Sequence, residues 1–122
     1  MNLPVSVNTL GSLITLGIGV FGLFWPLSVA KLVGIEPDGE RGLSEIRAVY
    51  GGLFLAIGLF ATIAQASDVF RVVGVGWIGA AGARSFSYVH DNSRSGTNLG
   101  SIVVELLVGV SMLVPWDSFF GA

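Results

Sequence analysis

The stretch Ala48–Ser67, AVYGGLFLAIGLFATIAQAS, contains no charged residue and decides the class of fold. A helix needs roughly 20 consecutive apolar residues to cross a hydrocarbon core about 30 Å thick, and this stretch meets that length. It is apolar around its whole circumference, whereas a surface helix of a soluble bundle is apolar along one stripe. We therefore predict a membrane-spanning helix that begins near Glu45 and ends near Ser67.

The composition of the whole chain agrees with a membrane environment. The 122 residues are 52% hydrophobic and 11% charged, against roughly 25% charged in an average soluble domain, and the mean hydropathy is +0.80. The formal net charge is -2 and no run of Lys or Arg is present, which excludes a nucleic-acid partner. The chain has no cysteine, which excludes disulfides, thiolate metal sites and a cysteine nucleophile.

Further apolar segments predict an all-α fold, an integral membrane four-helix bundle that forms a single domain over residues 1–122. The four predicted transmembrane helices are residues about 7–26, 45–67, 69–89 and 98–115. The third must include Arg71, Arg84 or both, and the fourth must include Glu105. Ionisable groups inside a membrane are costly, so these side chains are expected to find partners within the bundle.

Three other interpretations of the apolar segments are less favoured. Ser28-Val29-Ala30 resembles the cleavage site of a signal peptide, but no Lys or Arg precedes the apolar segment before it, so we expect that segment to be retained. A soluble bundle is disfavoured because the segments lack a single apolar stripe. A transmembrane barrel would need alternating ten-residue segments, which the sequence does not show.

The two longer connections, residues 27–43 and 90–98, lie on the same side of the membrane if the chain crosses it four times. We expect an interfacial turn at about residues 27–33 and an N-cap at Ser44. The loop side carries most of the basic residues, and the positive-inside tendency therefore predicts that both loops are cytoplasmic and both termini lie outside.

Four charged residues are expected to lie at one depth, in the half of the membrane next to these loops. Glu45 and Arg47 begin the second helix, Arg84 lies about one turn from the end of the third, and Glu105 lies about 9 Å into the fourth. Small residues share the helical faces of Arg84 and Glu105, so we predict an Arg84–Glu105 contact inside the bundle. Arg47 should point inward beside Tyr50, with Glu45 at the interface, where a helix N-terminus favours a carboxylate.

This polar cluster has three interpretations that the sequence leaves open. The first is a purely structural device that fixes the register of the helices, and the second is a site that binds a small polar ligand or ion or relays protons. Alternatively, Arg84 could extend to the lipid headgroups without any partner. The structural interpretation is favoured, because pairing all the charges consumes those that a functional site would use.

Other residues indicate close packing and no metal chemistry. Gly51, Gly52, Gly76 and Gly109 are expected to let helices approach one another closely. His90 is the one histidine in the chain, so no second nitrogen ligand exists and no metal site is predicted. No Ser-His-acid arrangement, phosphate-binding glycine loop or catalytic carboxylate pair is visible, so we predict no catalytic residue and no cofactor.

The segment Glu45-Ile46-Arg47-Ala48-Val49-Tyr50-Gly51-Gly52 resembles the acid-x-Arg-Ala-x-Tyr-Gly-Gly motif of domain of unknown function 4345, a family of small four-helix bacterial membrane proteins. The resemblance covers most of the chain, and Arg84 and Glu105 match its arginine late in helix three and its acid in helix four. It implies a multi-pass four-helix bundle of the bacterial inner (cytoplasmic) membrane, and it implies no established activity. In that membrane, termini outside the cytoplasm, as the charge distribution predicts, would be periplasmic. A looser similarity to the oxidase-subunit-like group of small membrane proteins would favour an accessory role.

These observations favour a non-catalytic membrane protein, namely a subunit, scaffold or accessory factor that acts through helix packing. Its expected partners are the lipid bilayer and either another membrane protein or a second copy of the chain. The alternative is a small-molecule or ion binding or transport protein that uses Arg47, Tyr50, Arg84 and Glu105; small multidrug exporters, however, depend on a carboxylate in the first helix, which is uncharged here. A third interpretation is a membrane enzyme acting on an apolar metabolite with Glu105 as acid or base.

Overall fold

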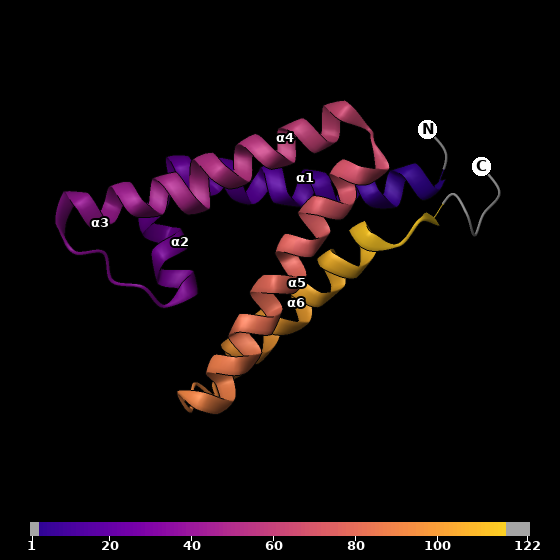
Figure 1. Cartoon of the computed structure of the whole chain (residues 1–122). Helices are drawn as coiled ribbons and strands as arrows, with labels where there is room; N and C mark the ends of the chain where they lie inside the picture. The colour runs from indigo at the N-terminus through magenta and orange to yellow at the C-terminus, as the bar shows by residue number, and fades with distance from the viewer. Residues whose placement is uncertain (1–2, 117–122) are drawn as a thin grey trace. The chain divides into compact units, whose positions relative to one another are not determined.

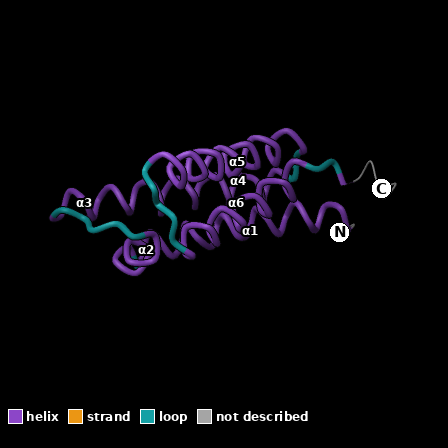
Figure 2. The backbone as a smooth tube through the Cα atoms, turned by 90° about the horizontal axis from the view of Figure 1, so that it is seen from below, coloured by secondary structure: helices purple, strands orange, loops and turns teal. Residues whose placement is uncertain are grey.

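The computed structural model describes residues 3–116, and within them every regular element is a helix (Figures 1 and 2). The elements are α1 Leu3–Phe24, α2 Pro26–Val33, α3 Gly39–Ile46, the π-helix η1 Arg47–Leu53, α4 Phe54–Ala64, α5 Ser67–His90 and α6 Gly96–Leu113. This confirms the predicted all-α class. We predicted on which side of the membrane the two ends of the chain lie, but residues 1–2 and 117–122 are outside the described part of the chain.

Three helical segments are long and apolar enough to cross a membrane. They are Val7–Phe24, Gly39–Ala64 and Gly96–Leu113, and they coincide with the first, second and fourth predicted spans. The third predicted span coincides with α5. This helix is long, but it carries Arg71 and Arg84 and is not among the three helices apolar enough to cross a membrane. The structure therefore supports a protein with membrane-spanning helices.

The chain forms two compact units. The α1–α4 unit consists of Ser12–Ala64, and the α5–α6 unit consists of the chain from Gln65 onward together with the start of α1, up to Gly11. Each unit has its own set of close helix contacts. We describe them in turn.

In the α1–α4 unit, the first helix ends where Pro26 interrupts it. Pro26 has no backbone N–H and begins the short helix α2, which ends at Gly34 with a left-handed φ of 76°. From Gly39 the chain is helical without a break through α3, η1 and α4 to Ala64.

Two local predictions for this unit are wrong. Residues 27–43 are mostly helical rather than a loop, because only Gly34–Asp38 lies outside α2 and α3. The turn predicted at residues 27–33 coincides with α2, and its interfacial position stays a prediction. The N-cap of the second long helix is Asp38 and not Ser44. The charges of Glu40 and Arg41 suggested a solvated loop, but α3 places both on its exposed side while Ile46 is buried.

Glycines bring α1 into backbone contact with η1 and α4. A Cβ atom at Gly22 would collide with the backbone carbonyl of Tyr50, and a Cβ at Gly51 would lie 2.8 Å from the Leu23 Cα. Gly19 and Gly58 make equally close approaches to the opposite helix. Such contacts are typical of membrane helices, which gain stability from packing because lipid is as apolar as their side chains.

In the α5–α6 unit, two long helices lie side by side, joined by the turn at residues 91–95 (Figure 1). They lie close together at Gly74 and Gly109, where a Cβ at Gly74 would lie 3.0 Å from the Gly109 carbonyl oxygen. The start of α1 completes this unit. The Asn8 side chain donates a hydrogen bond to the Ser111 carbonyl at 2.9 Å.

Several polar side chains are buried beside an apolar core, whereas many large apolar side chains are exposed. Ser12, Thr15 and Glu105 are buried. Large apolar side chains such as Phe60 and Leu107 are exposed. In water such a surface would drive association, whereas in a bilayer it is the surface that lipid tails solvate.

Candidate functional site

The centre of the candidate site is an ion pair between α5 and α6. The Arg84 Nε donates to Glu105 Oε1 at 2.8 Å and Arg84 Nη2 donates to Glu105 Oε2 at 3.1 Å, which makes the pair bidentate. The Glu105 side chain is 10% exposed and the Arg84 side chain 28% exposed. The predicted contact between these residues is confirmed.

A third donor of Arg84 extends the pair into a network. Arg84 Nη1 donates to Asn98 Oδ1 at 2.9 Å, and Asn98 Nδ2 donates in turn to the carbonyl and hydroxyl oxygens of Ser93, both at 2.9 Å. The Asn98 backbone N–H donates to the hydroxyl of Ser95, which caps α6. The network therefore connects both helices and the turn between them through one guanidinium.

Asn98 and Ser93 were not among the predicted site residues, although the sequence contains a signal for Asn98. Asn98 precedes Glu105 by seven residues, which places the two on the same face of α6, about 20° apart. No sequence rule assigns Ser93, because it lies in the irregular turn.

The inward direction of Arg84 follows from the buried face of α5. That face consists of Phe70, Val73, Gly74, Trp77 and Ala81. Arg84 continues it, because seven residues from Trp77 correspond to nearly two complete turns. On α6, Glu105 lies in the middle of a corresponding buried face with Ile102, Val108 and Met112.

The contacts of the four predicted packing glycines differ. Gly51 and Gly109 lie at close helix contacts, where a Cβ at Gly109 would be 2.7 Å from Ile78 Cδ1. A Cβ at Gly52 would meet only the Arg47 carbonyl of its own helix, at 3.9 Å. Within the described chain nothing lies within 4 Å of a Cβ at Gly76, which corrects its predicted role. Gly76 lies eight residues from Arg84, about 80° around the helix and away from the buried face.

The family motif forms the π-helix η1, which the sequence analysis did not foresee. Arg47, the first residue of η1, donates from Nη1 to the backbone carbonyl of Leu23, near the end of α1. In an uninterrupted helix this carbonyl would accept the N–H of Leu27, but Trp25 separates α1 from α2, which begins at Pro26. The guanidinium thus caps the C-terminus of α1, where a positive charge is favourable.

The remaining motif residues lie in the same α1–α4 unit as Arg47. Glu45 and Arg47 are exposed, and Tyr50 is half-buried with its ring 6.1 Å from the ring of Phe54. π-Helical segments are rare and occur frequently at functional sites. The convergence of Glu45, Arg47 and Tyr50 with the Arg84–Glu105 pair stays a prediction.

Within residues 3–116, no group of three or more His, Asp or Glu side chains is arranged to hold a metal ion. His90 stacks on the ring of Phe86, with 4.9 Å between the ring centroids. The arrangement around Arg84 instead suits a structural role in which it holds α5 against α6. The charge of Arg84 is neutralised by Glu105, and Arg84 donates hydrogen bonds to protein oxygens.

These features define a class of α-helical protein whose long helices are suited to a membrane and whose two C-terminal helices are joined by a buried ion pair. The chain belongs to the family described as Domain of unknown function (DUF4345), whose model matches residues 7–115. This confirms the resemblance based on the Glu45–Gly52 motif. No curated protein and no solved structure matches the chain.

Proposed function

We propose that this protein is a four-span protein of the bacterial inner membrane that acts as a non-catalytic scaffold, accessory factor or complex subunit. The observation that carries this proposal is the bidentate Arg84–Glu105 pair and its extension to Asn98. A buried acid that served catalysis or ion transport would need access to a substrate or ion, whereas the Glu105 charge is neutralised by Arg84 and its side chain is only 10% exposed.

The fourth span in this proposal is α5. It lies alongside α6, which is apolar enough to cross a membrane, and the turn that joins them is short. Two helices packed side by side over their length occupy the same depth. The cost of placing Arg84 in that environment is offset by its pairing with Glu105.

The proposed topology places α2, α3 and the α5–α6 turn on the cytoplasmic side. With four crossings, this side carries Lys31, Arg41, Arg47 and Arg94, whereas the other side carries Arg71. That difference agrees with the positive-inside tendency.

Cysteine labelling tests this topology directly, because the chain has no native cysteine. Single Asp38→Cys and Arg94→Cys variants should react with a membrane-impermeant thiol reagent from the cytoplasmic side alone. An Asp68→Cys variant should react from the periplasmic side alone. Labelling of positions 68 and 94 from one side would show that α5 does not cross the membrane and would overturn the four-span proposal.

Cross-linking in native membranes tests the scaffold role. The tagged protein is cross-linked before detergent extraction, purified and examined by mass spectrometry for stoichiometric membrane-protein partners, including a second copy of the chain. We expect one such complex, formed equally by wild type and by an Arg41→Gln surface control. A chain that stays monomeric in the membrane would contradict a role in assembly.

A further inference from the structure

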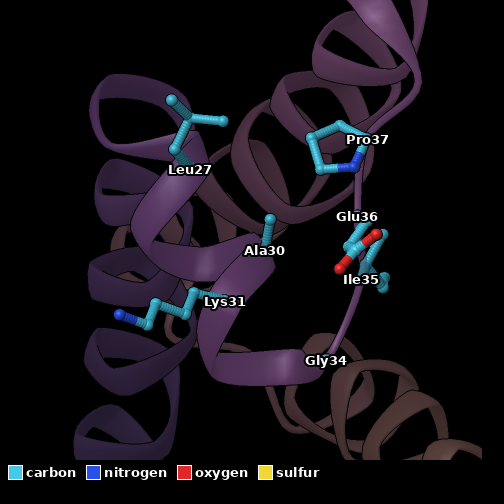
Figure 3. Close-up of a pocket in the computed structure, with 7 residues that line it drawn as sticks. All are labelled: Leu27, Ala30, Lys31, Gly34, Ile35, Glu36 and Pro37. Atoms are coloured by element: carbon cyan, nitrogen blue, oxygen red, sulfur yellow. The ribbon is translucent and has the colours of Figure 1, made fainter.

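A hollow of about 350 Å³ lies in the α1–α4 unit (Figure 3). One wall is the surface of α2, and the other is the segment that follows it. The lining residues are Leu27, Ala30, Lys31, Gly34, Ile35, Glu36 and Pro37. Its volume is in the lower part of the range for small-molecule sites, about 300–1,000 Å³.

Gly34 creates this hollow by turning the chain back along α2. With its φ of 76° it adopts the left-handed conformation that ends the helix, and the Ile35 N–H donates to the Ala30 carbonyl at 2.8 Å. Glu36 and Pro37 consequently lie opposite α2. The hollow is thus shaped by hydrogen-bonded backbone.

The charged residues of the hollow lie on opposite walls. Figure 3 shows the Glu36 carboxylate on the side of its segment that faces α2, while the Lys31 ammonium extends from α2 away from Glu36. Neither side chain takes part in the ion pairs found among residues 3–116. Between them the lining is apolar, with Leu27, Ile35 and Pro37.

The position of α2 in the chain places the hollow at the depth of lipid headgroups, an inference that rests on the membrane location proposed above. The apolar segment Val7–Phe24 ends one residue before Trp25, which is 57% exposed, and α2 begins at the next residue. Leu27 and Leu32 are 64% and 68% exposed on α2. An exposed tryptophan, exposed leucines and a lysine together are typical of the membrane interface.

We propose that this hollow binds the headgroup of a phospholipid that carries a primary ammonium, as in an ethanolamine phospholipid. Glu36 would accept hydrogen bonds from the ammonium, and Leu27 and Ile35 would contact the first carbons of the acyl chains. The long, flexible Lys31 side chain would turn from the direction seen in Figure 3 to contact the phosphate. An anionic glycerol headgroup would satisfy Lys31 alone and leave Glu36 without a cation. A choline headgroup carries the charge but has no N–H to donate.

The test is lipid binding to the detergent-purified full chain, measured by native mass spectrometry with ethanolamine, choline and glycerol phospholipids of identical acyl chains. We expect tightest binding of the ethanolamine lipid. Glu36→Gln should weaken binding of the ethanolamine lipid roughly tenfold, because one charge-assisted hydrogen bond is lost. The same change should leave binding of the choline lipid nearly unchanged. Lys31→Gln should weaken the binding of all three lipids.

Matched controls separate this site from general surface charge. Glu40→Gln and Arg41→Gln change exposed charges on α3 outside the hollow, and they should leave lipid selectivity unchanged. Equal binding of the three lipids, or an unaltered preference in Glu36→Gln, would overturn the proposal. Neither result would affect cysteine labelling or cross-linking, so failure of this site is distinguishable from failure of the membrane scaffold proposal.

Discussion

The two units of the chain hold their helices together by different means. In the α5–α6 unit, the bidentate Arg84–Glu105 ion pair and the Asn98 side-chain amide join the two helices and the turn between them. In the α1–α4 unit four glycines bring backbones together, and the one arginine at the contact donates to a backbone carbonyl. Because Gly74 and Gly109 also bring α5 and α6 close together, the comparison shows that close packing is common to both units and that the costly charge pair adds a specific geometry to one of them.

The largest expected effect is on the glycine contacts of the α1–α4 unit. Gly22→Val would push a side chain into the Tyr50 backbone, which cannot move without displacing η1. We expect a loss of about 3 kcal/mol or more, seen as a collapse of the folded fraction in size-exclusion chromatography. Gly17→Val on the same helix is the control, because a Cβ there meets nothing within 4 Å. Similar folded yields for both variants would contradict the backbone contact.

The next largest effect concerns the charge pair of the α5–α6 unit. Glu105→Gln should lower stability in detergent by about 2 to 3 kcal/mol, less than the ~3–5 kcal/mol of a fully buried pair, because the Arg84 side chain is 28% exposed. Glu45→Gln makes the same chemical change at an exposed position and should leave the melting temperature nearly unchanged.

A double-mutant cycle sharpens this test. If Arg84 and Glu105 act mainly on each other, Arg84→Met combined with Glu105→Leu should be more stable than either single variant, because no uncompensated charge stays buried. Additive losses would show that the two residues act independently.

A smaller effect is expected where α5 and α6 approach each other. Gly74→Ala places a Cβ 3.0 Å from the Gly109 carbonyl oxygen and should cost about 1 to 2 kcal/mol. Gly76→Ala on the same helix meets nothing within 4 Å and should be neutral, or stabilising by up to ~1 kcal/mol through helix propensity. Equal thermal shifts for the two variants would contradict the observed contact face of α5.

The smallest effect concerns the arginine that caps α1. Arg47→Gln removes a charged donor from the Leu23 carbonyl, but water can replace it at this exposed position. We expect a loss of about 0.5 to 1 kcal/mol, measured as a modest shift in melting temperature against an Arg41→Gln control. A loss as large as that of Glu105→Gln would indicate that Arg47 has a further buried partner.

The sequence by itself determined the helical class, the three strongly apolar spans and the pairing of Arg84 with Glu105. The physical reason is that these features depend on local composition and on the high cost of an isolated charge in an apolar medium. It also located the family motif. It did not reveal that this motif is π-helical, because the hydrophobic pattern over seven residues hardly distinguishes a π-helix from an α-helix.

Only the tertiary structure decided which glycines touch another helix and which groups complete the Arg84 network. Gly74 and Gly76 are both helical glycines two residues apart, yet only Gly74 faces α6, because that depends on how the two helices cross. Asn98 reaches Arg84 and Ser93 because the turn returns α6 alongside α5. Contacts of this kind join distant parts of the chain, so they follow from the packing of helices rather than from any pattern along the sequence.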